Sequence, residues 1–139
     1  MSYVYQKQSY GGRGLEKEML EVLRDQFKCA PVYEKDHLNG LEKNGANVSI
    51  EPGGQLELSG APLEIIHETC DETNLHLSEV KKVADEIGAG FIGLGAAPEW
   101  SHEDMDMMPK GRYRLMTDYM GKVGSHGKQM MYRTCTVQV

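Results

Sequence analysis

Residues 49–62 carry the pattern that most restricts the fold of this chain, because apolar and polar residues alternate on both sides of Pro52-Gly53-Gly54. Alternation with a period of two is typical of a half-buried β-strand, and a Pro-Gly-Gly segment is typical of a tight turn. If the turn is a three-residue loop, Ser49 pairs with Glu57, and Glu51 and Glu57 become diagonal neighbours roughly 7 to 8 Å apart. The pattern predicts a hairpin with one apolar and one acidic face.

The acidic face of this hairpin has two interpretations. Two long glutamate side chains that converge across a diagonal supply the oxygen ligands that Mg²⁺ prefers. Half-solvated antiparallel sheets show the same alternation with no ion bound. The pattern therefore leaves both open: Glu51 and Glu57 are metal ligands, or they are solvent-facing acids.

The remaining residues predict an α+β fold. Apolar residues recur at helical spacing in three segments, residues 15–27, 62–87 and 113–123. An antiparallel meander is indicated by four short extended runs, residues 31–34, 38–42, 47–51 and 55–59. Turn signals separate these runs, at Asn39-Gly40, Asn44-Gly45 and Pro52-Gly53-Gly54. We expect an antiparallel sheet with helices packed on one face.

The two ends of the chain give less regular signals. Residues 1–13 are polar and aromatic with two glycines, and we expect a poorly ordered lead-in there. A short strand is expected at residues 91–94. Residues 129–139 alternate and predict a final strand, which would place Thr134, Thr136 and Gln138 on its polar face and Arg133 on the opposite one.

Composition excludes several classes of partner. A length of 139 residues fits one domain or part of a larger one, and a net charge of -6 without a basic stripe argues against nucleic acid. No apolar run approaches the roughly 20 residues that span a bilayer, and the first residues lack the apolar core of a signal peptide. Cys29, Cys70 and Cys135 form no Cys-x-x-Cys pair, which indicates reduced thiols. We expect a cytoplasmic protein that does not bind membranes.

The segment Pro109-Lys-Gly-Arg-Tyr113 suggests an anion site. Its proline and glycine open a predicted helix, so Lys110 and Arg112 lie beside a helix N-terminus, where the positive end of the dipole favours anions. Arg112 is suited to binding a carboxylate with two parallel hydrogen bonds. A surface arginine near a helix end is the alternative.

Several motifs closely resemble the glutamate-cysteine ligases of plants and proteobacteria. They are Ser49-Ile-Glu-Pro-Gly-Gly-Gln-Leu-Glu-Leu-Ser-Gly-Ala-Pro-Leu-Glu64, His67-Glu-Thr-Cys70, Met108-Pro-Lys-Gly-Arg-Tyr113, Tyr119-Met and Met130-Met-Tyr-Arg-Thr-Cys-Thr-Val-Gln-Val139. The resemblance covers residues 14–139. The related ligases of ergothioneine biosynthesis share Glu-Pro-Gly-Gly-Gln, but the longer match favours the glutathione branch.

The resemblance implies a function. It implies part of a glutamine-synthetase-like catalytic domain over residues 14–139, in an enzyme that joins the γ-carboxylate of L-glutamate to L-cysteine through a γ-glutamyl phosphate, with ATP and Mg²⁺. Glu51 and Glu57 match metal-ligand positions, and Arg112 matches the anchor of the glutamate carboxylate. The substrate pocket implied by the final motif includes Arg133, Thr134, Thr136 and Gln138.

Departures from the family limit this expectation. The family begins with a Gly-x-Glu-x-Glu strand that supplies further carboxylates, and nothing before Gly14 matches it. The family domain also continues beyond the Val-Gln-Val segment. We therefore expect an incomplete domain that is inactive by itself, and a non-catalytic module that binds glutamate or partners an intact ligase is the alternative. The oligomeric state is left open.

Overall fold

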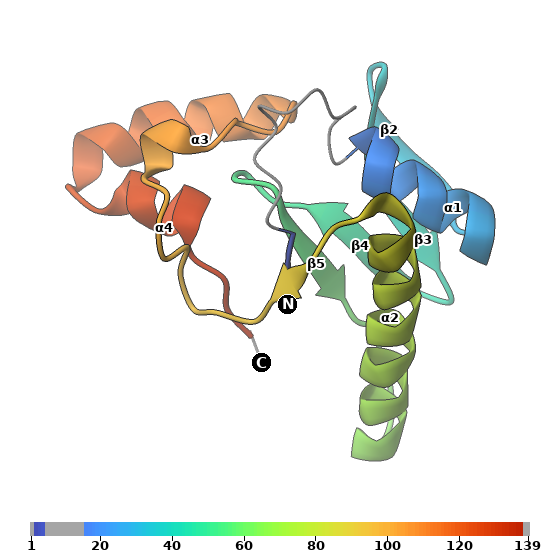
Figure 1. Ribbon diagram of the computed structural model, residues 1–139. Coiled ribbons are helices and arrows are strands. Elements are labelled where there is room, and N and C mark those ends of the chain that lie inside the picture. Colours follow the sequence, from blue (N-terminus) through green and yellow to red (C-terminus); the bar gives the residue numbers. More distant parts are fainter. Residues whose placement is uncertain (1, 5–15, 138–139) are drawn as a thin grey trace.

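The computed structural model describes residues 2–4 and 16–137. Within them, a six-stranded antiparallel sheet is combined with four α-helices, which confirms the α+β prediction (Figure 1). Among the described helices, none has both the length and the apolarity that crossing a bilayer requires.

The predicted meander forms the larger part of the sheet. Its strands are β2 (Ala30–Glu34), β3 (His37–Lys43), β4 (Ala46–Ile50) and β5 (Gln55–Ser59). Two short strands complete the order β2-β3-β4-β5-β1-β6, namely β1 (Ser2–Val4) and β6 (Phe91–Ile92).

Two local predictions in the sheet need correction. Residues 2–4 form a strand between β5 and β6, whereas a lead-in was expected there; residues 5–13 of that lead-in lie outside the described residues. Asn39-Gly40 lies inside β3, and the turn between β2 and β3 falls at Lys35 and Asp36. Lys35 has a φ of 56°, so a lysine takes the left-handed conformation that an Asn-Gly signal usually supplies.

The apolar face of the meander packs against the first helices. A π-helical turn η2 (Glu16–Leu20) leads into α1 (Glu21–Phe27), and the long α2 (Ile66–Ile87) lies beside them. The predicted long helix starts four residues late because the Glu68 carboxylate accepts the N–H groups of Glu64 and Ile65 ahead of the first turn. The core between these helices and the sheet includes Met19, Leu20, Leu23, Leu41, Ile50, Leu56, Val80 and Val83.

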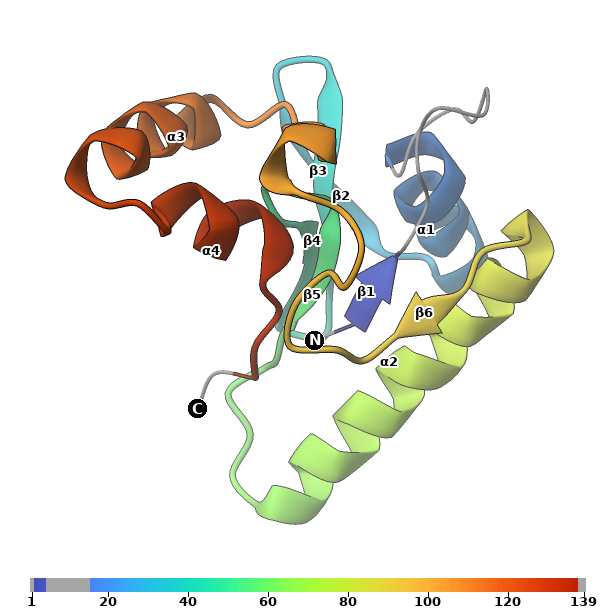
Figure 2. The same ribbon diagram turned by 60° about the vertical axis from the view of Figure 1, so that its left-hand side comes forward.

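The other helices lie across the sheet from α1 and α2. Figure 2 shows α3 (Gly111–Val123) and α4 (Gly127–Arg133) on the side of the meander away from α2. They meet the sheet at the β4–β5 turn, where the N–H of Met108, in the loop before α3, donates to the carbonyl of Pro52 at 3.1 Å. The polar face of the meander therefore lies beside α3.

The predicted strand over residues 129–139 is wrong for most of its length. Residues 127–133 form α4, and among the described residues 134–137 only Thr134 makes an isolated bridge, to Ala96. Residues 128–131 are Lys-Gln-Met-Met, which are good helix formers, and the helix buries both Met131 and Tyr132, which a strand would place on opposite faces. Tertiary packing of this turn of helix overrides the alternation that the sequence shows.

Candidate functional site

The β4–β5 hairpin has the predicted register. Ser49 lies opposite Glu57 and Ile50 opposite Leu56, and the N–H of Glu51 donates to the carbonyl of Gln55 at 2.8 Å. The N–H of Gly54 donates to the carbonyl of Glu51 at 2.8 Å, which closes the three-residue loop. Glu51 and Glu57 therefore lie on the same face, as the alternation predicted.

Two glycines of the loop are needed for different reasons. Gly54 has a φ of 85°, a conformation that favours glycine. A Cβ on Gly53 would lie 2.1 Å from the carbonyl oxygen of Tyr132, so the turn can approach the end of α4 only without a side chain. The loop sequence thus fixes both the hairpin and its contact with α4.

Gln55 fastens the hairpin to the end of α4. Its side-chain oxygen accepts the N–H of Gly53 at 2.8 Å, and its amide nitrogen donates to the carbonyls of Tyr132 and Thr134 at 3.2 and 2.9 Å. The last carbonyls of a helix have no partner inside the helix, and Gln55, 3% exposed, supplies one. The glutamine of the motif therefore has a structural role that sequence reasoning did not assign.

The polar face forms the floor of an open cavity of about 570 Å³. Side chains of the sheet that line it include Asn39, Asn47, Ser49, Glu51, Glu57 and Ser59. Lys110 and Arg112, at the start of α3, line the same cavity. The structure thus brings together three of the predicted site residues, Glu51, Glu57 and Arg112.

Glu51 is the centre of the contacts in this cavity. Its carboxylate lies 3.8 Å from the Lys110 ammonium and 4.0 Å from the Arg112 guanidinium. It also accepts hydrogen bonds from Ser49 Oγ at 3.0 Å and from the Tyr113 hydroxyl at 3.1 Å. The Glu57 carboxylate, by contrast, accepts only a long hydrogen bond in the described residues, from Ser59 Oγ at 3.3 Å.

Burial changes the acid–base properties of the residues around Glu51. It lowers the pKa of the Lys110 ammonium, against the attraction of Glu51. It raises the pKa of Tyr113 to about 12, although the hydrogen bond from Arg112 acts in the opposite direction. Tyr113 is 1% exposed, and its hydroxyl also donates to the carbonyl of Ile50. The tyrosine therefore stays protonated and holds α3 against β4.

The predicted anion site at the start of α3 already has an anion. The N–H of Gly111, the first residue of the helix, donates to the Glu34 carboxylate at 2.8 Å. Arg112 is 65% exposed and points its guanidinium toward the Glu51 side of the cavity. A substrate carboxylate in this cavity would therefore meet Arg112 more readily than the helix N-terminus.

Among the other predicted substrate residues, those that the structure describes do not line this cavity. Arg133 donates to the side chain of Gln129 at 2.8 Å and to the carbonyl of Ala97 at 2.7 Å, so it ties α4 to the loop after β6. Thr134 Oγ1 donates to the carbonyl of Met130. Thr136 is exposed beyond α4, and Gln138 lies outside the described residues.

Sequence reasoning missed the roles of Lys110, Tyr113 and Asn39. Lys110 was expected beside the helix N-terminus but was assigned no contact with Glu51, and Tyr113 was assigned no role. Asn39 was taken as a turn residue. It is 8% exposed, lines the cavity, and its amide nitrogen has no hydrogen-bond partner among the described residues. The sequence did contain a signal for this position: Asn39 follows the apolar Leu38, and strand alternation places it on the opposite, polar face of the sheet.

The donor set of the cavity suits a magnesium ion that arrives with a nucleotide. Mg²⁺ commonly binds through one or two carboxylates together with phosphates and water. Glu51 and Glu57 supply two carboxylates, and among residues 2–4 and 16–137 no group of three or more His, Cys, Asp or Glu side chains gathers for a metal. Glu57 is the freer ligand, because Glu51 is shared with two cations.

Comparison with known proteins identifies the family. Residues 13–139 match the model of glutamate-cysteine ligase family 2. The chain belongs to this family. It is 54% identical over 122 residues to the chloroplastic glutamate-cysteine ligase of Medicago truncatula and 53% identical to that of Arabidopsis thaliana. Glutamate-cysteine ligase A of Oryza sativa subsp. japonica, also chloroplastic, is 50% identical over 123 residues.

Two further findings concern the share of the relatives' length that this chain covers and the compartment in which the relatives are found. The matches cover 88% of this chain but only 24% of the Medicago enzyme and 25% of the rice enzyme, so this family member spans about a quarter of the length of these relatives. The expected cytoplasmic location is wrong, because these relatives are chloroplastic enzymes.

Proposed function

We propose that this chain forms part of the catalytic surface of an ATP-dependent glutamate-cysteine ligase. The complete protein would join the γ-carboxylate of L-glutamate to the amine of L-cysteine, the first step of glutathione biosynthesis. The observation that carries the proposal is the cavity in which Glu51 and Glu57 face Lys110 and Arg112. The names of the relatives support the reaction.

The reaction needs two displacements. A γ-carboxylate oxygen of glutamate attacks the terminal phosphorus of ATP, which releases ADP and leaves a γ-glutamyl phosphate. The cysteine amine then attacks the acyl carbon, loses a proton and displaces inorganic phosphate, so that one amide forms for each ATP split. Positioning and charge neutralisation account for most of the catalysis in phosphoryl transfer.

The residues of the cavity suit these steps. Glu57, together with Glu51, would hold Mg²⁺, which neutralises charge on the nucleotide phosphates when it is bound. Arg112 would bind the α-carboxylate of glutamate with paired hydrogen bonds. Lys110 would hold the Glu51 carboxylate in place through their ion pair. Arg133 and Thr134 are left out of this assignment because their side chains bind protein groups elsewhere.

The test is ADP release by the complete gene product. We expect release only when glutamate, cysteine and Mg²⁺ are all present, and no turnover by the 139-residue chain alone, which spans a quarter of its relatives. Failure of the complete protein to release ADP with both amino acids would overturn the enzymatic proposal. Calorimetry of the chain with glutamate tests the alternative module, which requires glutamate binding without hydrolysis.

The names of the relatives also support a plastid location for this protein. A fluorescent fusion of the complete gene product should coincide with chlorophyll autofluorescence in a plant cell. A diffuse signal outside plastids would contradict this location.

A further inference from the structure

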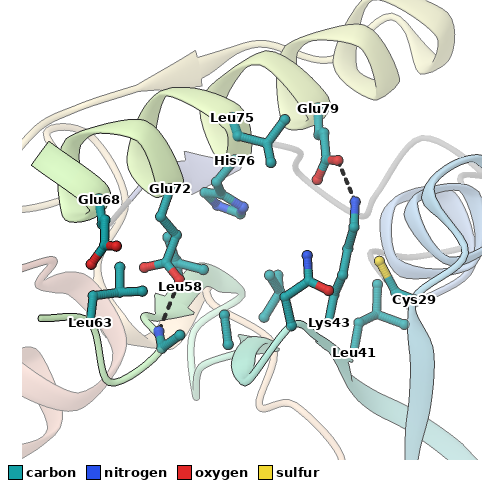
Figure 3. A pocket seen from close by; sticks show the side chains of 14 residues that line it. Cys29, Leu41, Lys43, Leu58, Leu63, Glu68, Glu72, Leu75, His76 and Glu79 are labelled. Carbon is teal, nitrogen blue, oxygen red and sulfur yellow. Dashed lines mark hydrogen bonds and ion pairs between the residues drawn. The ribbon is translucent and has the colours of Figure 1, made fainter.

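A second cavity lies on the opposite face of the hairpin, between α2 and the meander (Figure 3). Its volume is about 230 Å³, which is smaller than the roughly 300–1,000 Å³ typical of sites for drug-sized ligands. A small molecule with few non-hydrogen atoms fits this volume.

The floor of this α2 cavity is apolar. The sheet contributes Leu41, Val48 and Leu58, and the segment before α2 contributes Ala61 and Leu63. The cavity is open because α2 contacts the core only through its C-terminal half, where Val80, Val83 and Ala84 are buried. Leu75, one turn earlier, is 52% exposed and points toward the cavity in Figure 3.

The roof of the α2 cavity is acidic. Glu68, Glu72 and Glu79 all come from α2, whereas Lys43 is the only Lys or Arg among the described residues that line the cavity. Lys43 is paired with Glu79 at 2.6 Å, and Glu68 accepts backbone N–H groups at the start of the helix. Within the described lining, Glu68 and Glu72 therefore carry two negative charges that no lysine or arginine balances.

Glu72 is the carboxylate best placed for a ligand. Its Oε1 accepts the N–H of Ala61 at 2.9 Å, and no hydrogen bond from the described residues occupies its Oε2. His76, the next residue along this face of α2, has its pKa lowered by burial, although Glu79 and Glu72 oppose the change. The imidazole of His76 is therefore neutral at pH 7 and does not cancel the negative charge of Glu72.

We propose that the α2 cavity binds a small amphiphilic amine. The ammonium group would bind to Glu72, and the apolar body would lie on Val48 and Leu58. A charged donor and a carboxylate form a stronger hydrogen bond than neutral partners, and the apolar floor favours a ligand with a hydrocarbon body. An anion of the same shape would be repelled by Glu68 and Glu72.

This cavity adjoins the proposed catalytic surface through two strands. Val48 pairs with Leu58, and the next pair along the hairpin is Ser49 with Glu57. Successive side chains of a strand point to opposite faces, so the two cavities are back to back across β4 and β5. A ligand in the α2 cavity would therefore contact the opposite face of the strands beside Glu57, at a site separate from that of the proposed function.

Calorimetry of the 139-residue chain tests the proposal with three probes of one shape. We expect 2-phenylethylammonium to bind about tenfold more tightly than neutral 2-phenylethanol, and phenylacetate not to bind, because only the ammonium gains a charge-assisted hydrogen bond. Equal affinity for the three probes, or no binding of the amine, would overturn the proposal. The readout is independent of ATP turnover, so it stays separate from the test of the proposed function.

Two variants locate the ammonium. Glu72→Gln keeps an oxygen that can accept the Ala61 N–H but removes the charge, and we expect it to weaken amine binding about tenfold. Asp71→Asn is the matched control, because Asp71 is exposed on the same helix turn and does not line the cavity. Equal effects of the two variants would show that the amine senses only net charge and would contradict the assignment of Glu72.

Discussion

Lys110 and Glu51 form a partly buried ion pair, with the ammonium nitrogen 3.8 Å from a carboxylate oxygen and side-chain exposures of 9% and 21%. The pair joins the N-terminal end of α3 to the end of β4, at the edge of the cavity that carries the proposed chemistry. Its members come from sequence positions nearly 60 residues apart. The cavity therefore depends on tertiary packing as much as on the hairpin motif.

A double-mutant cycle measures this pair. Lys110→Met and Glu51→Gln should each destabilise the chain, and the double variant should lose less than the sum of the two. We expect a coupling free energy of about 1 kcal/mol in urea denaturation, because the pair is partly buried. Additive losses would show that Lys110 and Glu51 do not stabilise each other.

The Gly53 position tests the contact between the hairpin and α4. Gly53→Ala places a methyl group 2.1 Å from the Tyr132 carbonyl oxygen and should destabilise the fold by about 2 kcal/mol or more. Gly93→Ala is the matched control, because no atom of the described residues beyond its chain neighbours lies within 4 Å of its added Cβ. The unfolding midpoints of both variants in urea give the comparison. A similar loss for both would remove the close approach as the reason for glycine at residue 53.

Gln55 offers a test of the helix end. Gln55→Ala leaves the carbonyls of Tyr132 and Thr134 without their side-chain donor, and we expect a loss of about 1–3 kcal/mol. Hydrogen exchange should then speed up in α4 more than in α2. Uniform acceleration across both helices would instead indicate global destabilisation without a local role.

The cysteines should differ in their reactivity toward thiol reagents. Cys70 is exposed on α2, whereas Cys135 is buried and Cys29 is half-buried. Burial raises the pKa of the Cys29 thiol, so less thiolate is present at a given pH. The rate at which Cys29 reacts should therefore continue to rise above the pH at which a free thiol is half ionised. Stopped-flow reaction of single-cysteine variants with a disulfide reagent gives these rates. Cys29 reacting as fast as Cys70 at pH 8 would contradict the described burial.

The sequence patterns were most informative where one local rule decides the structure. Ser49 pairs with Glu57 because Pro52-Gly53-Gly54 allows one loop length, and alternation then assigns each side chain to a face. The same rule was wrong at residues 129–133, which belong to α4, a helix held in place by Gln55, far away in sequence. The hydrogen bond from Gly111 to Glu34 and the ion pair of Lys110 with Glu51 also join residues that are far apart in sequence. No local sequence spacing predicts such contacts.

We propose above all that the face carrying Glu57 binds the magnesium ion of the nucleotide. The direct measurement is the Mg²⁺ dependence of glutamate-stimulated ADP release by the complete gene product. Glu42→Gln is the control, because Glu42 is exposed on β3 and does not line the cavity with Glu57. We predict that Glu57→Gln raises the Mg²⁺ concentration for half-maximal rate about tenfold or more while the fold stays intact. An unchanged Mg²⁺ titration for Glu57→Gln would contradict the account.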